Sequence, residues 1–446
     1  MNRSGRTPLL RAKNLEKILG ISEIYLKLEG ANPYGHKFDR IGELLVKDAR
    51  MSKRTTILID GPRRYIDTVC SYADQDGFKI IIPVFKGQSW KSKTYSKDQL
   101  ITMKGSSLED QQLSTQLLCE KENYYNGANG YYNTHLAITA LEEIGEEICE
   151  RLDEISSVYV QLSYGYTVSS LYNSFFKAWA KGSMDRYPNI ISCTIPKGNR
   201  VFDDYVEQNK IADIEDYDLK INKYTKDLYI ENTQLLEETL KAVKDTEGEI
   251  ITVTEDLLKE ASALLRSTEQ INLSTEEAYS FAGFYKMAKT GLMKKGTHII
   301  ILNDGRSDVQ IERVTDNSQF SIEVLKSYVD NFLMQYSDPL DEIEESIENA
   351  LAKGAIFLAF MNKEVQGITI VVHGGFEKFF PTYHLAYIGT NKGRKGRGIA
   401  SALIDEVIQF SDGKVSLHVD LDNKRAKKLY EKFGFKHKYN RMIYSQ

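Results

Sequence analysis

A turn rich in glycine and basic residues lies in the last quarter of the chain, between two segments of regular periodicity. Residues 394–400 read Arg-Lys-Gly-Arg-Gly-Ile-Ala. The apolar run His384–Ile388 before it predicts a strand, and Ser401–Phe410 after it has the spacing of an amphipathic helix. Glycines let a backbone approach an anion closely, and the unpaired N–H groups of a helix's first turn point towards it. The sequence therefore predicts a strand, a pyrophosphate-binding turn and a helix in succession.

A second pattern follows, after a predicted strand at Val415–Val419. It predicts a helix that a glycine ends, and it consists of Asn423, Ala426, Tyr430, Gly434 and Phe435. Together the two patterns resemble the acetyl-CoA-binding core of the GNAT family of N-acetyltransferases. The resemblance implies a C-terminal α/β domain that uses acetyl-CoA.

The resemblance also implies roles for individual residues. Tyr430 stands where the family often places the general acid for the departing thiolate, and Asn423 where a side chain often contacts CoA. Tyr430 could instead pack the last helix, and Asn423 could instead cap it. The residues expected to hold the CoA pyrophosphate are those of the turn itself, Lys395, Gly396, Arg397, Gly398, Ile399 and Ala400.

The general base of acetyl transfer is less clear from the sequence. The strand before the turn carries no carboxylate, so His384 at its start is the candidate, because histidine titrates near neutral pH. Deprotonation through water is the alternative. The acidic stretch Asp338–Glu348 lies where this family usually builds the acceptor pocket. It either attracts a cationic amine or forms a solvated helix face.

The first three hundred residues alternate short β-rich runs with helical stretches. Such alternation predicts α/β architecture with parallel sheets covered by helices. The predicted helices include residues 134–152 and 275–289, and the predicted strands are 57–59, 80–84, 158–162, 190–194 and 298–302.

This region resembles the fold-type II enzymes that use pyridoxal phosphate (PLP), the group of tryptophan synthase β, threonine synthase and cysteine synthase. The segments that carry the resemblance are 7–10, 24–40, 76–84 and 277–302. It implies a two-lobed unit with PLP as a possible cofactor and Lys37 as the Schiff-base lysine. Many members place this lysine three residues after a glycine, whereas Lys37 follows Gly35 by two. A subgroup of deaminase- and desulfhydrase-like enzymes has the same Gly-x-Lys spacing. The alternative is a surface lysine near a helix start.

The other cofactor positions depart further from the family pattern. The phosphate loop maps onto residues 162–170, where Ser163, Gly165 and Thr167 are the candidate contacts and two tyrosines add bulk. Asp304 is the candidate partner of the pyridine nitrogen, or else a turn former. The loop that usually supplies an asparagine reads Asp-Gly-Pro-Arg-Arg at residues 60–64. The arginines Arg63, Arg64 and Arg306 are alternatives for binding a carboxylate or phosphate.

Length and composition set the outer limits of these expectations. The 446 residues suffice for two or three domains, expected as a PLP-like unit at 1–312 with a small lobe at about 46–145, a linker at 313–319 and an acetyltransferase domain at 320–446. The net charge of −5 argues against a nucleic-acid partner. No apolar run is long enough to span a membrane, and the start of the chain has no signal-peptide pattern. The four cysteines and seven histidines are scattered, so we expect no metal site and a cytoplasmic location.

Three functional hypotheses follow. In the first, the protein is an acetyl-CoA-dependent N-acetyltransferase that acts on the amine of a small amino acid or related metabolite, and its PLP-like domain is degenerate or repurposed. In the second it is bifunctional, and Lys37 forms a PLP Schiff base for β-elimination or replacement before acetylation. In the third it is an amino-acid-sensing scaffold without turnover. The expected partner is a small-molecule amine, and a homodimer is the assembly to test.

Overall fold

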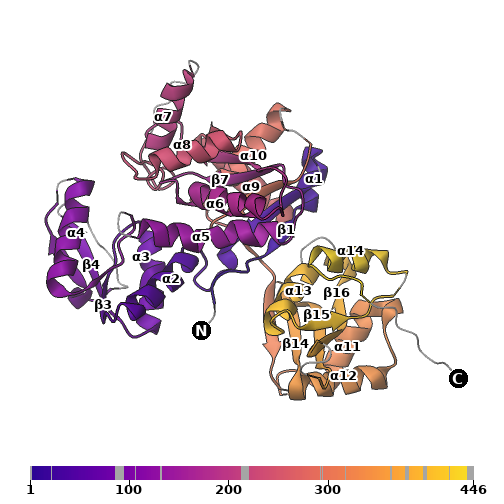
Figure 1. The fold of residues 1–446 in the computed structure, drawn as a ribbon. Helices are drawn as coiled ribbons and strands as arrows, with labels where there is room; N and C mark the ends of the chain where they lie inside the picture. The colour runs from indigo at the N-terminus through magenta and orange to yellow at the C-terminus, as the bar shows by residue number, and fades with distance from the viewer. Residues whose placement is uncertain are drawn as a thin grey trace. The chain divides into compact units, whose positions relative to one another are not determined.

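The computed structural model describes residues 3–21, 23–85, 95–105, 107–130, 133–211, 220–291, 293, 295–316, 318–361, 364–376, 381–394, 399–420 and 422–438. Residue contacts divide the chain into two compact units with the main boundary between Arg306 and Ser307 (Figure 1). The predicted linker at 313–319 begins inside a strand, Gln310–Val314, that belongs to the sheet of the second unit. None of the described helices is long and apolar enough to cross a membrane.

The first unit is built on a six-stranded sheet with the order β1-β2-β11-β7-β8-β9. Along this sheet β2, β11, β7, β8 and β9 pair in parallel. Every residue of the central strands β2, β7 and β11 is buried, as expected for parallel strands covered on both faces. The strands are β1 (Leu9–Arg11), β2 (Ile24–Leu28), β7 (Ser157–Gln161), β8 (Asn189–Thr194), β9 (Glu249–Thr252) and β11 (His298–Leu302).

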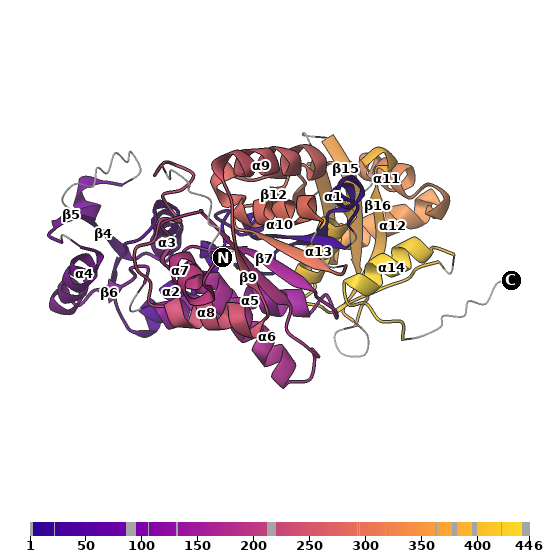
Figure 2. The same cartoon turned by 90° about the horizontal axis from the view of Figure 1, so that it is seen from above.

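A smaller parallel sheet with the order β5-β4-β3-β6 forms the second lobe of this unit. Its elements gather at one end of the unit (Figure 2). They are β3 (Thr56–Leu58), α3 (Arg63–Gln75), β4 (Lys79–Phe85), β5 (Leu100–Met103), α4 (Leu108–Glu122) and β6 (Tyr125–Asn126). The two parallel sheets confirm the predicted fold class of this region.

The remaining helices of the first unit pack around these sheets. They are α1 (Lys13–Leu19), α2 (Phe38–Met51), α5 (Thr134–Cys149), α6 (Tyr166–Ala180), α7 (Arg200–Asn209), α8 (Leu236–Asp245), α9 (Glu255–Glu269) and α10 (Tyr279–Thr290), with β10 (Ile271–Asn272) and β12 (Arg306–Ser307) forming a two-stranded ribbon. In α2 the buried residues recur at helical spacing, at 41, 42, 45, 46 and 49.

A buried network of charges attaches α2 to the large sheet. The guanidinium of Arg40, which is 2% exposed, donates to both carboxylate oxygens of Glu29 at 2.8 and 2.9 Å and to Glu147 of α5 at 2.6 Å. Lys27 of β2, also buried, pairs with Glu147. Arg40 holds the pKa of Glu29 down to about 2 against the effect of burial. Each buried charge in the network is therefore compensated by an opposite charge.

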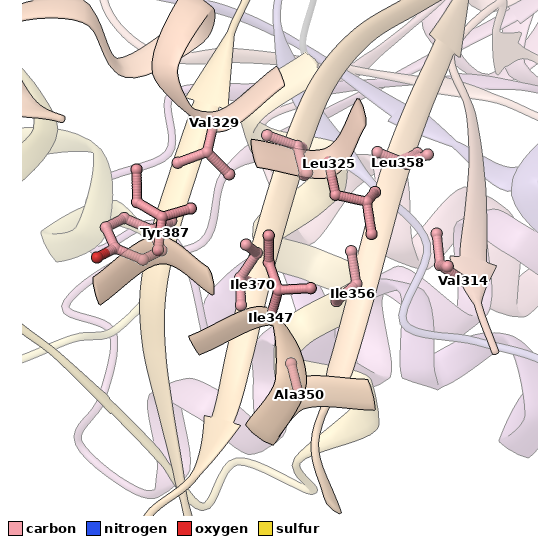
Figure 3. Packing of buried hydrophobic residues seen from close by; sticks show 11 residues of the cluster. Val314, Leu325, Val329, Ile347, Ala350, Ile356, Leu358, Ile370 and Tyr387 are labelled. Atoms are coloured by element: carbon pink, nitrogen blue, oxygen red, sulfur yellow. The ribbon is translucent and has the colours of Figure 1, made fainter. Parts of the chain in front are cut away.

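The second unit has a five-stranded sheet with the order β13-β14-β15-β16-β17, antiparallel except for the last pair. Its strand β14 alternates between two cores, as the period of a strand requires. Ile356 and Leu358 face the helices α11 and α12 (Figure 3), whereas Phe357 and Ala359 face α13. The elements are β13 (Gln310–Val314), α11 (Ile322–Leu333), α12 (Leu340–Lys353), β14 (Ala355–Met361), β15 (Glu364–His373), β16 (Tyr383–Thr390), α13 (Ile399–Phe410), β17 (Val415–Leu417) and α14 (Lys424–Lys432).

Candidate active sites

A tight turn before α2 presents Lys37 to the interior of the first unit. The amide of Gly35 donates to the carbonyl of Asn32 at 2.9 Å, and Gly35 takes a φ of 83°, which glycine adopts without strain. The carboxylate of Asp39 accepts the amides of Tyr34 at 2.7 Å and His36 at 3.1 Å. The backbone amide of Lys37 donates to the carbonyl of Asn303 at 3.0 Å. The turn is therefore tied to the end of β11, and Lys37 lies immediately before α2.

The side chain of Lys37 is buried and points into a pocket. The residue is 6% exposed, and its Nζ donates to the hydroxyl of Thr167 at 2.9 Å. Burial lowers the pKa of the Lys37 amine to about 8, although Glu277 and Glu29 oppose the shift. A larger fraction of this amine is thus neutral at physiological pH than in an exposed lysine. The surface-lysine interpretation of Lys37 is wrong.

The pocket around Lys37 brings together three of the four predicted PLP residues. Ser163, Gly165 and Thr167 line it, and so do the bulky Tyr164 and Tyr166. Further lining residues come from both lobes of the unit, among them Arg64, Asn129, Gln161, Asp227, Glu277 and Asn303.

Gly165 is required where the chain turns from β7 into α6. It has a φ of 98°, and a Cβ placed on it would lie 2.0 Å from the Thr239 hydroxyl. No described side chain hydrogen-bonds as a cap at this helix end. The first turn of α6 therefore has no side-chain cap among the described residues, and Ser163 and Thr167 at the same helix start line the pocket, an arrangement that suits an anion.

Asp304 lies next to this pocket but is not among the described residues that line it. Its carboxylate accepts the backbone amide of Ser274 at 3.2 Å and the guanidinium of Arg64 at 3.1 Å. Asp304 therefore forms a contact between the two lobes through Arg64, whereas the neighbouring Asn303 faces the pocket. The predicted contact of Asp304 with a pyridine nitrogen has no support from this geometry.

The arginines singled out in the sequence differ in their surroundings. Arg64 lines the pocket while it holds Asp304. Arg63 pairs with Asp67 on the next turn of α3 at 2.8 Å, and Arg306 is exposed in β12. Only Arg64 is placed to meet a ligand of the Lys37 pocket.

Several polar residues of this pocket were not recognised in the sequence, and Glu277 and Asn129 are two of them. Glu277 is a carboxylate at the end of a short 3-10 turn before α10. Asn129 lies against Gly61, so it supplies an amide beside the loop that lacks the family's asparagine. A pattern search within one segment finds neither, because each reaches the pocket from an element distant in sequence.

The residues of the pocket suit PLP. A buried lysine with a lowered pKa provides an amine for its aldehyde, and two hydroxyl groups beside an uncapped helix start provide donors for its phosphate. Lys37 would hold the cofactor covalently, and Ser163, Thr167 and the first turn of α6 would hold its phosphate.

In the second unit, β16 pairs with β17 over only a short stretch. Residues Tyr383–Leu385 pair with Val415–Leu417, and the rest of β16 extends beyond β17 in the described part of the chain. The register with β15 shifts at this point, which makes Ala386 an additional residue in β16. The shift redirects the backbone groups of β16 where they are no longer paired with β17.

The predicted CoA turn is only partly described. Lys395, Gly396, Arg397 and Gly398 lie outside the described residues. Ile399 and Ala400 form the first turn of α13, directly after them. The helix begins two residues before the predicted Ser401, and the role of the turn stays a prediction.

Tyr430 lies in α14, and Asn423 lies immediately before this helix. Tyr430 is 7% exposed, and burial raises the pKa of its phenol to about 12, so it keeps its proton at neutral pH. Its ring packs edge-on against Phe435. Asn423 caps the helix, because its side-chain oxygen accepts the amide of Ala426 at 3.1 Å. Both structural alternatives are therefore realised in the fold, and the two functional roles remain predictions.

The polar residues of β16 form two separate pairs. His384 lies 3.0 Å from the Ser416 hydroxyl through Nδ1, and its ring centre is 4.4 Å from that of His418. Tyr387 donates its phenolic proton to Asp338, just before α12, at 2.8 Å. The acidic stretch thus reaches β16 through Asp338.

Comparisons with known proteins agree with both folds. A family model described as pyridoxal-phosphate dependent enzyme matches residues 69–305, and one described as acetyltransferase (GNAT) family matches residues 322–435. The chain belongs to the pyridoxal-phosphate dependent enzymes, and its C-terminal part is a GNAT domain. Both resemblances drawn from the sequence are confirmed, and the two families imply PLP and acetyl-CoA as cofactors.

Individual relatives match about two thirds of the chain. A threonine synthase of Methanocaldococcus jannaschii is 26% identical over 308 residues, which are 68% of this chain and 74% of that protein. A threonine synthase of a Bacillus species is 23% identical over 313 residues, or 68% of this chain and 82% of that protein. Solved structures of maize serine racemase and of threonine deaminase isoform 2 from Solanum lycopersicum both give a TM-score of 0.52, at 15% and 14% identity. They cover 67% and 68% of this chain and 88% and 84% of their own chains, and they share its fold.

Proposed function

We propose that this protein is a bifunctional enzyme. Its first unit carries out PLP-dependent chemistry on a small amino acid through Lys37, and its GNAT domain acetylates the amine of a small amino acid or related metabolite. The observation that carries the proposal is the buried amine of Lys37 with a pKa of about 8. It favours the bifunctional hypothesis over a degenerate first domain.

The buried position of Lys37 has a free-energy cost. Burying a lysine side chain without a full counter-charge is unfavourable, and a fold keeps such a group where it has a use. Here the amine contacts only a neutral hydroxyl at hydrogen-bond distance among the described residues, on the helix turn that suits a phosphate. A purely structural lysine at a helix start would gain more by reaching water.

The residues of the pocket have separate roles. Lys37 would hold PLP through its amine, Ser163 and Thr167 would hold the phosphate, and Arg64 would meet an anionic group of the amino acid. PLP, when bound, withdraws electrons from the bonds of an attached amino acid. The threonine synthase relatives are named for a small amino acid, which supports this substrate class.

Acetyl transfer requires a polarised thioester, a neutral amine and a proton for the departing thiolate. Backbone amides of β16 beyond Leu385, where β17 no longer pairs with the strand in the described part of the chain, would polarise the acetyl carbonyl, and the protonated Tyr430 would supply the proton. The carboxylate of Asp338, held by Tyr387, would attract the cationic amine. His384 is the candidate base.

The first experiment tests the PLP-dependent half. The protein is incubated with PLP, reduced with borohydride, digested and analysed by mass spectrometry. The cofactor should be found on the peptide that contains Lys37, and the substitution Lys37→Ala should abolish it. Lys47→Ala is the matched control, because Lys47 lies exposed on the same helix. Absence of attachment in the wild type would reject this half and favour a repurposed domain.

The second experiment tests the acetyltransferase half. Release of the CoA thiol is followed with acetyl-CoA and a panel of small amino acids. We expect turnover with at least one of them and a mass increase of one acetyl group on its amine. Turnover only with protein amines would exclude the proposed substrate class. Binding of amino acids without any turnover would favour the sensing scaffold.

A further inference from the structure

Glu277 is the centre of a cluster of polar side chains beside Lys37. One carboxylate oxygen, Oε2, accepts the side-chain amides of Gln161 at 3.2 Å and Asn303 at 2.8 Å. The other, Oε1, lies 3.5 Å from Nε2 of His36. The three neighbours come from the end of β7, the end of β11 and the turn before α2. The carboxylate is thus held from three directions, and all four side chains line the pocket.

The carboxylate of Glu277 is ionised. Burial alone would raise its pKa, but His36, Asn303 and Lys37 lower the pKa to about 2. Nδ1 of His36 accepts the backbone amide of Phe38 at 3.2 Å, so the Nε2 side of the ring faces Glu277. The Glu277 carboxylate therefore places a negative charge at the wall of the pocket.

The cluster is also rich in acceptors. Gln161 and Asn303 each turn their NH₂ group towards Glu277, which leaves the carbonyl oxygens Oε1 of Gln161 and Oδ1 of Asn303. Both oxygens are buried and have no hydrogen-bond donor among the described residues. The side chains are 8% and 2% exposed. Buried acceptors are normally satisfied, so these two oxygens indicate that a donor belongs to this site.

We propose that the Glu277 cluster binds a protonated nitrogen of a ligand in the Lys37 pocket, either the ring nitrogen of PLP or the ammonium group of an amino acid. The first source rests on the proposed function, whereas the second does not. A cationic N–H donor meets the negative charge and the two acceptors together. Arg64 on another side of the pocket suits the carboxylate of the same amino acid.

Calorimetric titrations of the full chain test the proposal with three probes. They are PLP, an analogue of PLP whose ring nitrogen is replaced by C–H, and L-serine. Each is titrated into the wild type, Glu277→Gln and Gln161→Met, the last of which removes one donor and one acceptor at similar volume. Glu142→Gln is the matched control, because Glu142 is a buried acid of α5 that does not line the pocket. Thermal unfolding verifies that each variant is folded.

Two results would support the proposal and identify the source. If the ring nitrogen is bound, the wild type prefers PLP to the analogue by about tenfold or more, and Glu277→Gln loses the preference. If the ammonium is bound, the analogue binds with the same affinity as PLP, and Glu277→Gln weakens the binding of L-serine by about tenfold or more. Gln161→Met should show a smaller loss of the same kind, and Glu142→Gln none.

The proposal is overturned if Glu277→Gln changes neither the preference for PLP nor the affinity for L-serine, or if the wild type binds none of the three probes. The cluster would then only stabilise the fold. Attachment of PLP to Lys37, detected after borohydride reduction, is a separate readout. Failed attachment with Glu277-dependent binding of L-serine would reject the PLP-dependent function and leave the binding role of the cluster intact.

Discussion

Asp60 makes the stability of the first unit depend on pH. Burial raises the pKa of this half-buried carboxyl to about 6 from an ordinary value of 3.8, despite a hydrogen bond from the amide of Gly61. The folded protein therefore holds the proton more tightly than the unfolded chain. The associated stability is complete below about pH 4 and is lost as the pH rises through 6.

Asp60→Asn should remove the loss of stability that accompanies the rise in pH. We expect the variant to be more stable than the wild type by about 1–2 kcal/mol at pH 8, a value reduced for the partial exposure of the group, and nearly equal to it at pH 4. Urea unfolding at the two pH values measures the difference. Equal stabilisation at both would show that the effect is not ionisation.

Glu277 should also set the reactivity of Lys37. Its negative charge opposes the effect of burial on the lysine, so Glu277→Gln is expected to lower the pKa of Lys37 below its present value of about 8. A fall of about one unit is typical for losing a nearby opposite charge. The pH dependence of reductive methylation at Lys37, followed by mass spectrometry, reports this pKa. Glu142→Gln should leave it unchanged.

At the scale of elements, the turn into α6 depends on Gly165. Gly165→Ala would place a Cβ both at a φ of 98° and against the Thr239 hydroxyl. Gly182, just after the same helix, has a φ of 71° but open space around it, so Gly182→Ala measures the conformational cost alone. We expect Gly165→Ala to lose about 1–3 kcal/mol more in stability than Gly182→Ala, because only it also overpacks the turn. Gly165→Ala should also weaken the binding of PLP. Equal losses in denaturant titrations would contradict the steric argument.

The start of α14 offers a way to separate the two roles of Asn423. Aspartate is also a good N-cap, so Asn423→Asp should keep the helix, whereas Asn423→Ala should lose about 1 kcal/mol. If Asn423 also contacts CoA, the added negative charge should weaken acetyl-CoA binding while the melting temperature is kept. Unchanged acetyl-CoA binding in a folded Asn423→Asp variant would leave the cap as its role.

At the scale of the whole molecule, each unit has its own sheet, core and candidate site, so each activity should be lost separately. Lys37→Ala should abolish PLP attachment and leave acetylation of an added amine unchanged. Tyr430→Phe should lower the acetylation rate by about a hundredfold if it is the general acid, with PLP attachment retained. Tyr336→Phe, at an exposed tyrosine, is the control. Loss of both activities in either variant would contradict this independence.

The two folds could be predicted from the sequence because both depend on local patterns. Fully apolar runs such as Ile299–Leu302 indicate a buried parallel strand, and the glycine before Ile399 indicates a helix start. The place of Lys37 could also be predicted, since the glycine turn and the start of α2 are adjacent in sequence.

The side chains that meet in the pocket could not be predicted in the same way. Glu277 reaches Lys37 because the ends of β7 and β11 and the turn before α2 come together, and no pattern within one segment encodes this. Asp304 illustrates the same limit. Whether it or Asn303 faces the pocket depends on how the chain leaves β11 and on the distant Ser274 and Arg64.

The charge network that attaches α2 to the large sheet has a consequence for the response of the protein to heat. Water solvates charged groups less favourably as the temperature rises, so the cost of burying Lys27, Glu29 and Arg40 falls on warming, while stabilisation by apolar contacts levels off. The attachment of α2 therefore becomes more stable relative to the rest of the unit as the temperature rises. The turn that presents Lys37 is expected to be among the last parts of the first unit to loosen on heating.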